Sequence, residues 1–123
     1  MDKEPVFAEG GAPPAGPYSP GVKAGNLLFV SGQGPFDAEG NLVGDDFATQ
    51  ARATFANVER IILAAGGSLS GVVRIGAYLS TLDHFAQWNE IMREFLPEPY
   101  PARTTIPAAL PGFLIEIDAV VLL

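Results

Sequence analysis

Apolar residues recur with a helical period between Asp45 and Ala65. The spacings are four, four, three and four, through Phe47, Ala51, Phe55, Val58 and Ile62. This pattern predicts one buried face of an α-helix. Asp45 or Asp46 can serve as its N-cap, and the pair Gly66-Gly67 ends it.

A second helix is predicted from Ser80 or Thr81, either of which can cap it, through Leu96, and Pro97 stops it. Its apolar stripe consists of Phe85, Trp88, Met92, Phe95 and Leu96. Asn89 lies on or beside this stripe. A polar amide on an apolar face is the first irregularity in the pattern.

Three segments favour β-strands. The first is NLLFVSG, residues 26–32, which is rich in strand formers and ends at a glycine turn. The second runs from Val72 to Ser80, and the third from Phe113 to Leu123. The third segment is apolar on one face, and its other face is also mostly apolar, so both faces require cover. The glycine- and proline-rich chain before residue 26 is predicted to cross the surface as turns or extended backbone.

The predicted order of strand, helix, strand, helix and strand indicates a single α+β domain over residues 1–123. Two helices can cover only one face of its sheet. In a chain this small, another copy of the same chain is the expected cover for the second apolar face. The sequence therefore predicts a homo-oligomer.

Charge and composition exclude several classes of function. Seven basic residues face fourteen acidic ones, giving a net charge of -7, and the basic residues form no cluster. A nucleic-acid partner is therefore not expected, because phosphates require a basic surface. We also find no apolar run long enough for a membrane span, and we expect a soluble, cytoplasmic protein.

The residues needed for several common active sites are scarce. The chain has no cysteine and one histidine, His84, which we interpret as a surface or capping residue. Neither a nucleophilic triad nor a zinc site is expected, and no metal is predicted. The SGQGP segment lacks the third glycine of a dinucleotide fingerprint, and its glycines are assigned to a turn.

Arg103 is the only cation after Arg93, and it stands between Pro101 and Pro107 in stiff, extended backbone. Its planar fork of donors can orient a small organic acid by binding the carboxylate. The alternative is an ordinary surface ion pair. Composition alone does not separate the two.

Glu116 lies in the middle of the last predicted strand, between Ile115 and Ile117. Burying an unpaired carboxylate costs several kcal/mol, so Glu116 must be paired, solvated at an interface or protonated. An internal ion pair with Arg103 is one reading. The other is a raised pKa that allows Glu116 to hold a water molecule or move a proton.

Five ordered motifs resemble the Rid family of reactive-intermediate (imine/enamine) deaminases. They are GPYSPG (16–21), VSGQGP (30–35), Asn89 within FAQWNE, PARTTI (101–106) and LPGFLIEID (110–118). The resemblance spans nearly the whole chain. It implies a chorismate-mutase-like α+β fold with a mixed sheet, two helices on one face, and a homotrimer with active sites between subunits.

By position, the resemblance implies that Arg103 pairs with the substrate carboxylate and that Glu116 is associated with the attacking water. A backbone carbonyl near Thr105 would help to hold that water. Tyr18, Ser31 and Asn89 correspond to positions that line the same pocket. Phe36, Phe113 and Trp88 are instead interpreted as core aromatics.

The implied reaction is hydrolysis of 2-imino acids, formed from enamines such as 2-aminoacrylate, to 2-oxo acids and ammonia without any cofactor. Two alternatives stay open: a non-catalytic trimer that binds small carboxylates, and a pathway-specific enzyme such as an aminomuconate deaminase. Three positions depart from many family members, which have glutamine at Pro20, a branched aliphatic residue at Gly34 and cysteine at Thr105. The first two departures are expected to alter the mouth of the pocket.

Overall fold

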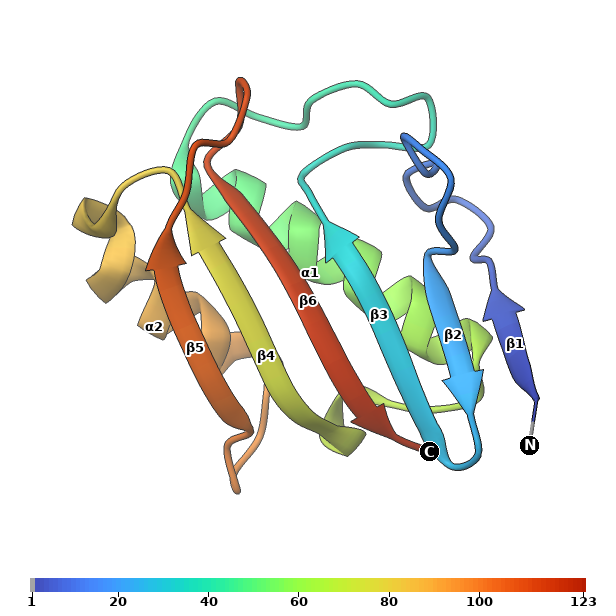
Figure 1. The fold of residues 1–123 in the computed structure, drawn as a ribbon. Coiled ribbons are helices and arrows are strands. Elements are labelled where there is room, and N and C mark those ends of the chain that lie inside the picture. Colours follow the sequence, from blue (N-terminus) through green and yellow to red (C-terminus); the bar gives the residue numbers. More distant parts are fainter. Residues whose placement is uncertain (1) are drawn as a thin grey trace.

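A computed structural model describes residues 2–123 as one layer of β-sheet covered on one side by two helices (Figure 1). Within these residues six strands pair in the order β1-β2-β3-β6-β4-β5. The strands are β1 (Lys3–Val6), β2 (Gly21–Ala24), β3 (Leu27–Gln33), β4 (Val72–Leu79), β5 (Ala102–Pro107) and β6 (Ile115–Leu122). Only β4 and β5 pair in parallel, so the sheet is mixed. The predicted α+β domain is confirmed.

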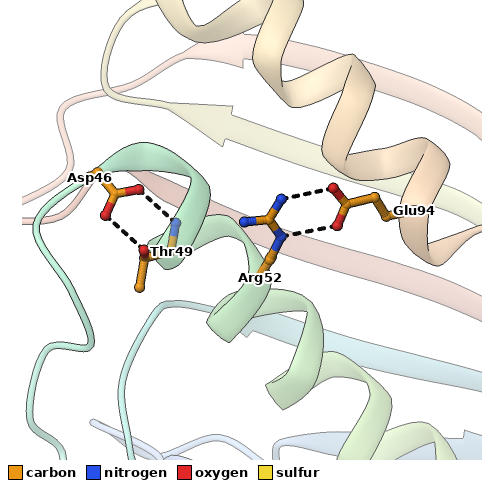
Figure 2. Close-up of polar contacts among 4 residues, drawn as sticks. All are labelled: Asp46, Thr49, Arg52 and Glu94. Carbon is orange, nitrogen blue, oxygen red and sulfur yellow. Dashed lines mark hydrogen bonds and ion pairs between the residues drawn. The ribbon is translucent and has the colours of Figure 1, made fainter.

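Helix α1 (Phe47–Ala64) follows the sequence pattern closely. Asp46 is its N-cap, and the Asp46 carboxylate accepts hydrogen bonds from the Thr49 backbone N (3.1 Å) and Oγ1 (2.7 Å) (Figure 2). Gly66 follows the helix with a φ of +89°. A residue with a side chain rarely adopts this conformation, which explains why glycine ends the helix.

Helix α2 (Phe85–Phe95) is shorter than the sequence predicted. Thr81 caps a separate 3₁₀ turn, η2 (Leu82–His84), and the α-helix begins only after it. The prediction that Ser80 or Thr81 caps the second helix is therefore wrong for α2, whose N-cap is His84, because a 3₁₀ turn capped by Thr81 occupies the expected first turn. His84 stacks on Phe47 with ring centroids 4.4 Å apart, which fits its interpretation as a residue at a helix terminus.

Both helices pack on the same face of the sheet, and the hydrophobic core lies between them and the strands. Its fully buried members include Phe55, Val58, Trp88, Ile115 and Ile117. On the outer side of the helices, Arg52 of α1 forms a bidentate ion pair with Glu94 of α2 (Figure 2). None of the helices in residues 2–123 has the length and apolar character needed to span a bilayer.

Strands β1, β2 and β5 were not predicted as strands. β1 and β2 have four residues each, and β1 is an exposed edge strand that contains Pro5. β5 is the opposite edge, flanked by Pro101 and ending at Pro107. Prolines are tolerated at sheet edges, where one side of the backbone needs no partner. The edge strands β1 and β5 contain proline and β2 has only four residues, so no alternating pattern marks these segments and the sequence predicted only extended chain or turns there.

No segment within residues 2–123 covers the other face of the sheet, which we call the open face. It carries Phe29 and Ser31 of β3, Tyr78 of β4, and Glu116, Asp118 and Val120 of β6. Phe29 is 44% exposed. The last strand does present a second face, but this face is less apolar than predicted, because Glu116 and Asp118 share it with Val120 and Leu122.

Candidate functional site

Arg103 lies on edge strand β5, and its side chain turns toward the helices. Its Nη1 donates a hydrogen bond to Oδ1 of Asn89 on α2, at 2.7 Å. The guanidinium carbon lies 5.4 Å from the ring centroid of Phe85 and 5.9 Å from that of Trp88. Asn89, which interrupted the apolar stripe of the helix, therefore orients the guanidinium against these aromatic rings.

No carboxylate among residues 2–123 neutralises Arg103, since the ion pair in this part of the chain joins Arg52 to Glu94. Partial burial, and secondarily the Arg93 cation, lowers the pKa of Arg103. An arginine nevertheless stays protonated in proteins. The guanidinium lines a hollow with Tyr100 and Met92, where its remaining donors can receive an anion.

Thr105 lies two residues along β5, on the same face of the strand as Arg103. Its hydroxyl oxygen accepts a hydrogen bond of 3.0 Å from Nε1 of Trp88, the buried tryptophan of α2. The side chain of Thr105 therefore ties β5 to α2. This contact uses the side chain of Thr105. It does not involve the backbone carbonyl near Thr105, which the family resemblance associates with the attacking water.

Glu116 projects from the open face, where the neighbouring strand gives it little room. A Cβ atom at Gly32 of β3 would lie 2.5 Å from Oε2 of Glu116. Only glycine at position 32 allows the carboxylate to pack so closely on the backbone. Burial, and secondarily the Asp118 carboxylate, raises the pKa of Glu116 above its ordinary value.

Ser31 and Tyr18 line the same hollow as Glu116. Ser31 Oγ donates to the Ser19 carbonyl at 2.6 Å, and the Tyr18 hydroxyl accepts from the Ala15 backbone N at 3.0 Å. These bonds hold the turn of residues 15–19 above the open face. Tyr18 is 45% exposed, so its ring forms part of the rim.

The structure divides the six predicted site residues into two groups on opposite faces of the sheet. Arg103, Asn89 and Thr105 lie on the helix side at one edge. Tyr18, Ser31 and Glu116 lie on the open face. The alternative of an internal ion pair between Arg103 and Glu116 is therefore wrong for a single chain, because a strand directs alternate side chains to opposite faces.

Some residues beside these groups were not identified as site residues from the sequence. Asp118 lies next to Glu116 on the open face, where its Oδ2 accepts a hydrogen bond of 2.9 Å from the Tyr78 hydroxyl. Its position two residues after Glu116 on the same strand is a signal that sequence analysis could have used. Phe36 and Phe113, interpreted as core, lie outside the core and line a second hollow beside Glu116, whereas Trp88 is fully buried as predicted.

Comparisons with known proteins identify the family of this chain. A family model described as Endoribonuclease L-PSP matches residues 10–123. The chain is 41% identical over 121 residues to a RutC family protein of Pyrococcus horikoshii, covering 96% of both chains. It is 33% identical over 113 residues to a Dermatophagoides farinae protein named 2-iminobutanoate/2-iminopropanoate deaminase, covering 89% of this chain and 88% of the other.

A solved structure has the same fold. The crystal structure of RidA from the Antarctic bacterium Psychrobacter sp. PAMC 21119 superimposes with a TM-score of 0.93 at 38% identity, covering 98% of this chain and 99% of that one. The family predicted from the five motifs is therefore confirmed. This chain belongs to the Endoribonuclease L-PSP family, which includes the RutC and RidA proteins.

Proposed function

We propose that this protein hydrolyses reactive 2-imino acids, and the enamines that tautomerise to them, to 2-oxo acids and ammonia. The observation that carries the proposal is Arg103, a guanidinium oriented by Asn89 and aromatic rings but unpaired with any carboxylate of residues 2–123. The similarity to a mite protein named as an imine deaminase supports the same chemistry.

In this proposal Arg103 binds the carboxylate of the substrate. A guanidinium and a carboxylate can form two parallel hydrogen bonds, which fix both the position and the plane of the acid. The rings of Phe85 and Trp88 limit the water around the cation, so the attraction is screened less than at an open surface. This contact places the imine carbon at a defined distance from the catalytic groups.

We further propose that the protein is a homotrimer whose sites lie between subunits. Arg103 and Glu116 are on opposite faces of one sheet, so one small substrate cannot contact both within a chain. The open face carries exposed apolar residues, including Phe29, Ile106 and Leu122, which a second copy would cover. A site between copies would combine Arg103 of one subunit with the Tyr18, Ser31 and Glu116 group of its neighbour.

Glu116 is assigned to proton transfer. Burial raises the pKa of Glu116, which makes its carboxylate a stronger base than that of an exposed glutamate. It would accept a proton from water as the water oxygen attacks the imine carbon. With the imine nitrogen protonated, this attack gives a neutral carbinolamine, and Glu116 would return its proton to the carbinolamine nitrogen. As the C–N bond breaks, the carbinolamine hydroxyl would give its proton back to the Glu116 carboxylate, so that the carbonyl forms and ammonia leaves.

The test is the release of 2-oxo acid from 2-iminopropionate, generated in solution by an amino-acid oxidase. We expect the wild-type protein to accelerate release and Arg103→Ala to reduce kcat/KM by a hundredfold or more, as loss of a charged positioning contact does. Arg52→Ala is the matched control, because it removes an arginine that already has a carboxylate partner.

Three results would change the conclusion. If the folded wild-type protein does not accelerate release, the hydrolase proposal is wrong. Binding of pyruvate that depends on Arg103 without turnover would instead favour a non-catalytic carboxylate-binding protein. Activity confined to one elaborate imine, such as that from an aminomuconate, would favour a pathway-specific deaminase.

A further inference from the structure

A second hollow opens beside Glu116, and its walls are apolar. It has a volume of about 430 Å³. Its principal walls are the side chains of Pro13, Pro14, Pro20, Phe36, Pro111 and Phe113. Glu116 is the only charged residue that lines it, and Gln33 and Tyr18 are the other polar side chains of the lining, so most of the wall offers a ligand apolar contacts.

The two aromatic rings in this wall form a single unit. Phe36 and Phe113 meet edge to face, with centroids 5.2 Å apart and ring planes at 74°. A Cβ atom at Gly34 would lie 2.8 Å from Cε2 of Phe36 and 3.5 Å from Cε2 of Phe113. The absence of a side chain at Gly34 therefore allows the Phe36 ring to occupy its place in the wall.

Buried amides hold the segments that carry these rings. Asn57 of α1, which is 1% exposed, donates from Nδ2 to the carbonyls of Gly34 (2.9 Å) and Phe36 (2.8 Å). Gln50, which is 2% exposed, accepts at 2.8 Å from the backbone N of Leu114, the residue after Phe113. Because both amides belong to the core helix, the wall is already formed before any ligand binds.

Glu116 and Tyr18 line both this apolar pocket and the polar hollow that contains Ser31 and Asp118. A substrate whose reacting carbon lies at Glu116 thus has an apolar pocket on one side. We infer that this pocket receives the side chain of the substrate, and that the preferred substrates are 2-imino acids with a large apolar side chain, aromatic ones above all. The inference rests on the proposed function, because that function places the reacting carbon at Glu116.

The size of the pocket supports a large group. A closed apolar cavity of about 150 Å³ is enough to hold benzene. The pocket here is larger, and its aromatic edges and proline rings offer contacts that a methyl group would leave unfilled. Each methylene placed in such a pocket changes kcat/KM by about tenfold or more.

The experiment compares 2-iminopropionate with 2-imino-3-phenylpropionate, made in solution by an amino-acid oxidase from alanine and phenylalanine. Binding of pyruvate and phenylpyruvate is measured in parallel by titration calorimetry. Ala12→Leu fills the pocket from a partly exposed loop position, where it does not threaten the fold. Ala38→Leu, on an exposed turn outside the pocket, is the matched control.

We expect kcat/KM of the wild type to be at least about tenfold higher for the aromatic imine, by the same methylene argument. Ala12→Leu should lower the ratio of the two kcat/KM values at least about tenfold. Ala38→Leu should leave the ratio unchanged. The affinity for phenylpyruvate should exceed that for pyruvate, and Ala12→Leu should remove the difference.

Failure of this inference is distinguishable from failure of the proposed function. Hydrolysis of 2-iminopropionate that depends on Arg103, with no preference for the aromatic imine or no response to Ala12→Leu, overturns the inference and leaves the function standing. If neither imine is hydrolysed, the function is wrong. The calorimetry then tests whether the apolar pocket receives a large apolar side chain. Phenylpyruvate binding that is tighter than pyruvate binding and is weakened by Ala12→Leu supports this inference, whereas equal binding of the two acids overturns it.

Discussion

The two faces of the sheet differ in which side chains they bury and how completely. Strand β6 shows this difference within eight residues. On the helix side, Ile115, Ile117 and Val121 are completely buried. On the open face, Glu116, Asp118 and Val120 alternate with them and are only half-buried. The helix side follows the rules of a core, whereas the open face keeps two carboxylates close together among apolar neighbours. A stable fold does not require that second arrangement, which is why we assign function to it.

Arg52 of α1 and Arg103 of β5 show a similar contrast. Arg52 meets Glu94 at the exposed surface, and both of its hydrogen bonds satisfy a carboxylate of the same chain. Arg103 is more buried and meets only the neutral amide of Asn89 and the thioether sulfur of Met92. An exposed pair contributes little, whereas a partly buried cation without a counter-ion is the feature on which the proposed binding of a substrate carboxylate rests.

The largest effect on stability should follow from truncating a core side chain on the helix side of the sheet. Phe55 is fully buried and stacks on Trp88 and Phe95, with centroids 5.6 Å and 4.6 Å away. Phe55→Ala should lower the free energy of unfolding by about 3–5 kcal/mol, because the cavity cannot fully collapse. Urea titration followed by the fluorescence of Trp88, the single tryptophan, measures it.

Phe29→Ala on the open face is the matched control for that variant. Its direct cost within one chain should be below about 1 kcal/mol, since the ring is already half exposed. In the proposed homotrimer, the wild-type unfolding midpoint rises with protein concentration, and Phe29→Ala should weaken that dependence. Equal losses in the two variants at low protein concentration would contradict the distinction between the faces.

Sequence patterns predicted the helix side well and the open face poorly, for a physical reason. Period and capping locate α1, β4 and β6 because those elements bury one face against the same chain. The short strands β1, at the sheet edge, and β2, beside it, bury little, and no period marks them. Phe36 and Phe113 were assigned to the core because aromatic spacing reports that a residue packs, but not whether it packs on protein or lines a pocket.

Sequence patterns singled out Arg103, Glu116 and Asn89, the resemblance supplied the roles of the site residues, and their positions in space could not be predicted. PARTTI identifies Arg103, and the alternation of β6 identifies Glu116. Their separation on opposite faces depends on which side of β5 meets α2, which only the folded chain reveals. Where copies of the chain meet is likewise decided by surfaces that no local pattern describes.

Removal of the Glu116 charge should affect turnover more than binding. Glu116→Gln keeps the size of the side chain but cannot move a proton, so we expect kcat to fall by about a hundredfold, the lower end for a general acid–base group. Pyruvate should still bind, because Arg103 is intact. Glu90→Gln, on the exposed side of α2, is the control. Unchanged kcat in Glu116→Gln would assign proton transfer to another group.

Glu116 should also make stability depend on pH with a definite sign. Its folded pKa is raised above the ordinary value of 4.5, so the folded protein holds this proton more tightly than the unfolded chain does. The folded state is therefore penalised as pH rises from about 4.5 through the raised pKa. The stability of Glu116→Gln minus that of the wild type should grow over this window and then level off.

Subtraction of the two stability curves isolates this effect. The pKa values of Asp46 and Glu94 are lowered by hydrogen bonds to Thr49 and Arg52, so these groups oppose the trend by losing stability as pH falls. Both proteins contain them, and their contributions cancel in the difference. A difference that stays flat with pH would show that Glu116 is not desolvated in the folded protein.

The smallest expected change concerns Asp118, which acts on Glu116 only through its charge. Asp118→Asn keeps an oxygen that can accept from the Tyr78 hydroxyl but removes the anion that helps to raise the pKa of Glu116. If Glu116 must be ionised to accept a proton, the rising limb of kcat/KM against pH reports its pKa in the free enzyme. That limb should move to lower pH in Asp118→Asn, although not fully to the ordinary value, because burial is the larger cause of the raised pKa.

Tyr78→Phe is the control, because it removes the hydrogen bond to Asp118 but leaves the Asp118 charge. The rising limb of the Tyr78→Phe profile should therefore stay in place. A limb that moves equally in both variants would trace to altered packing of the open face rather than to the charge of Asp118.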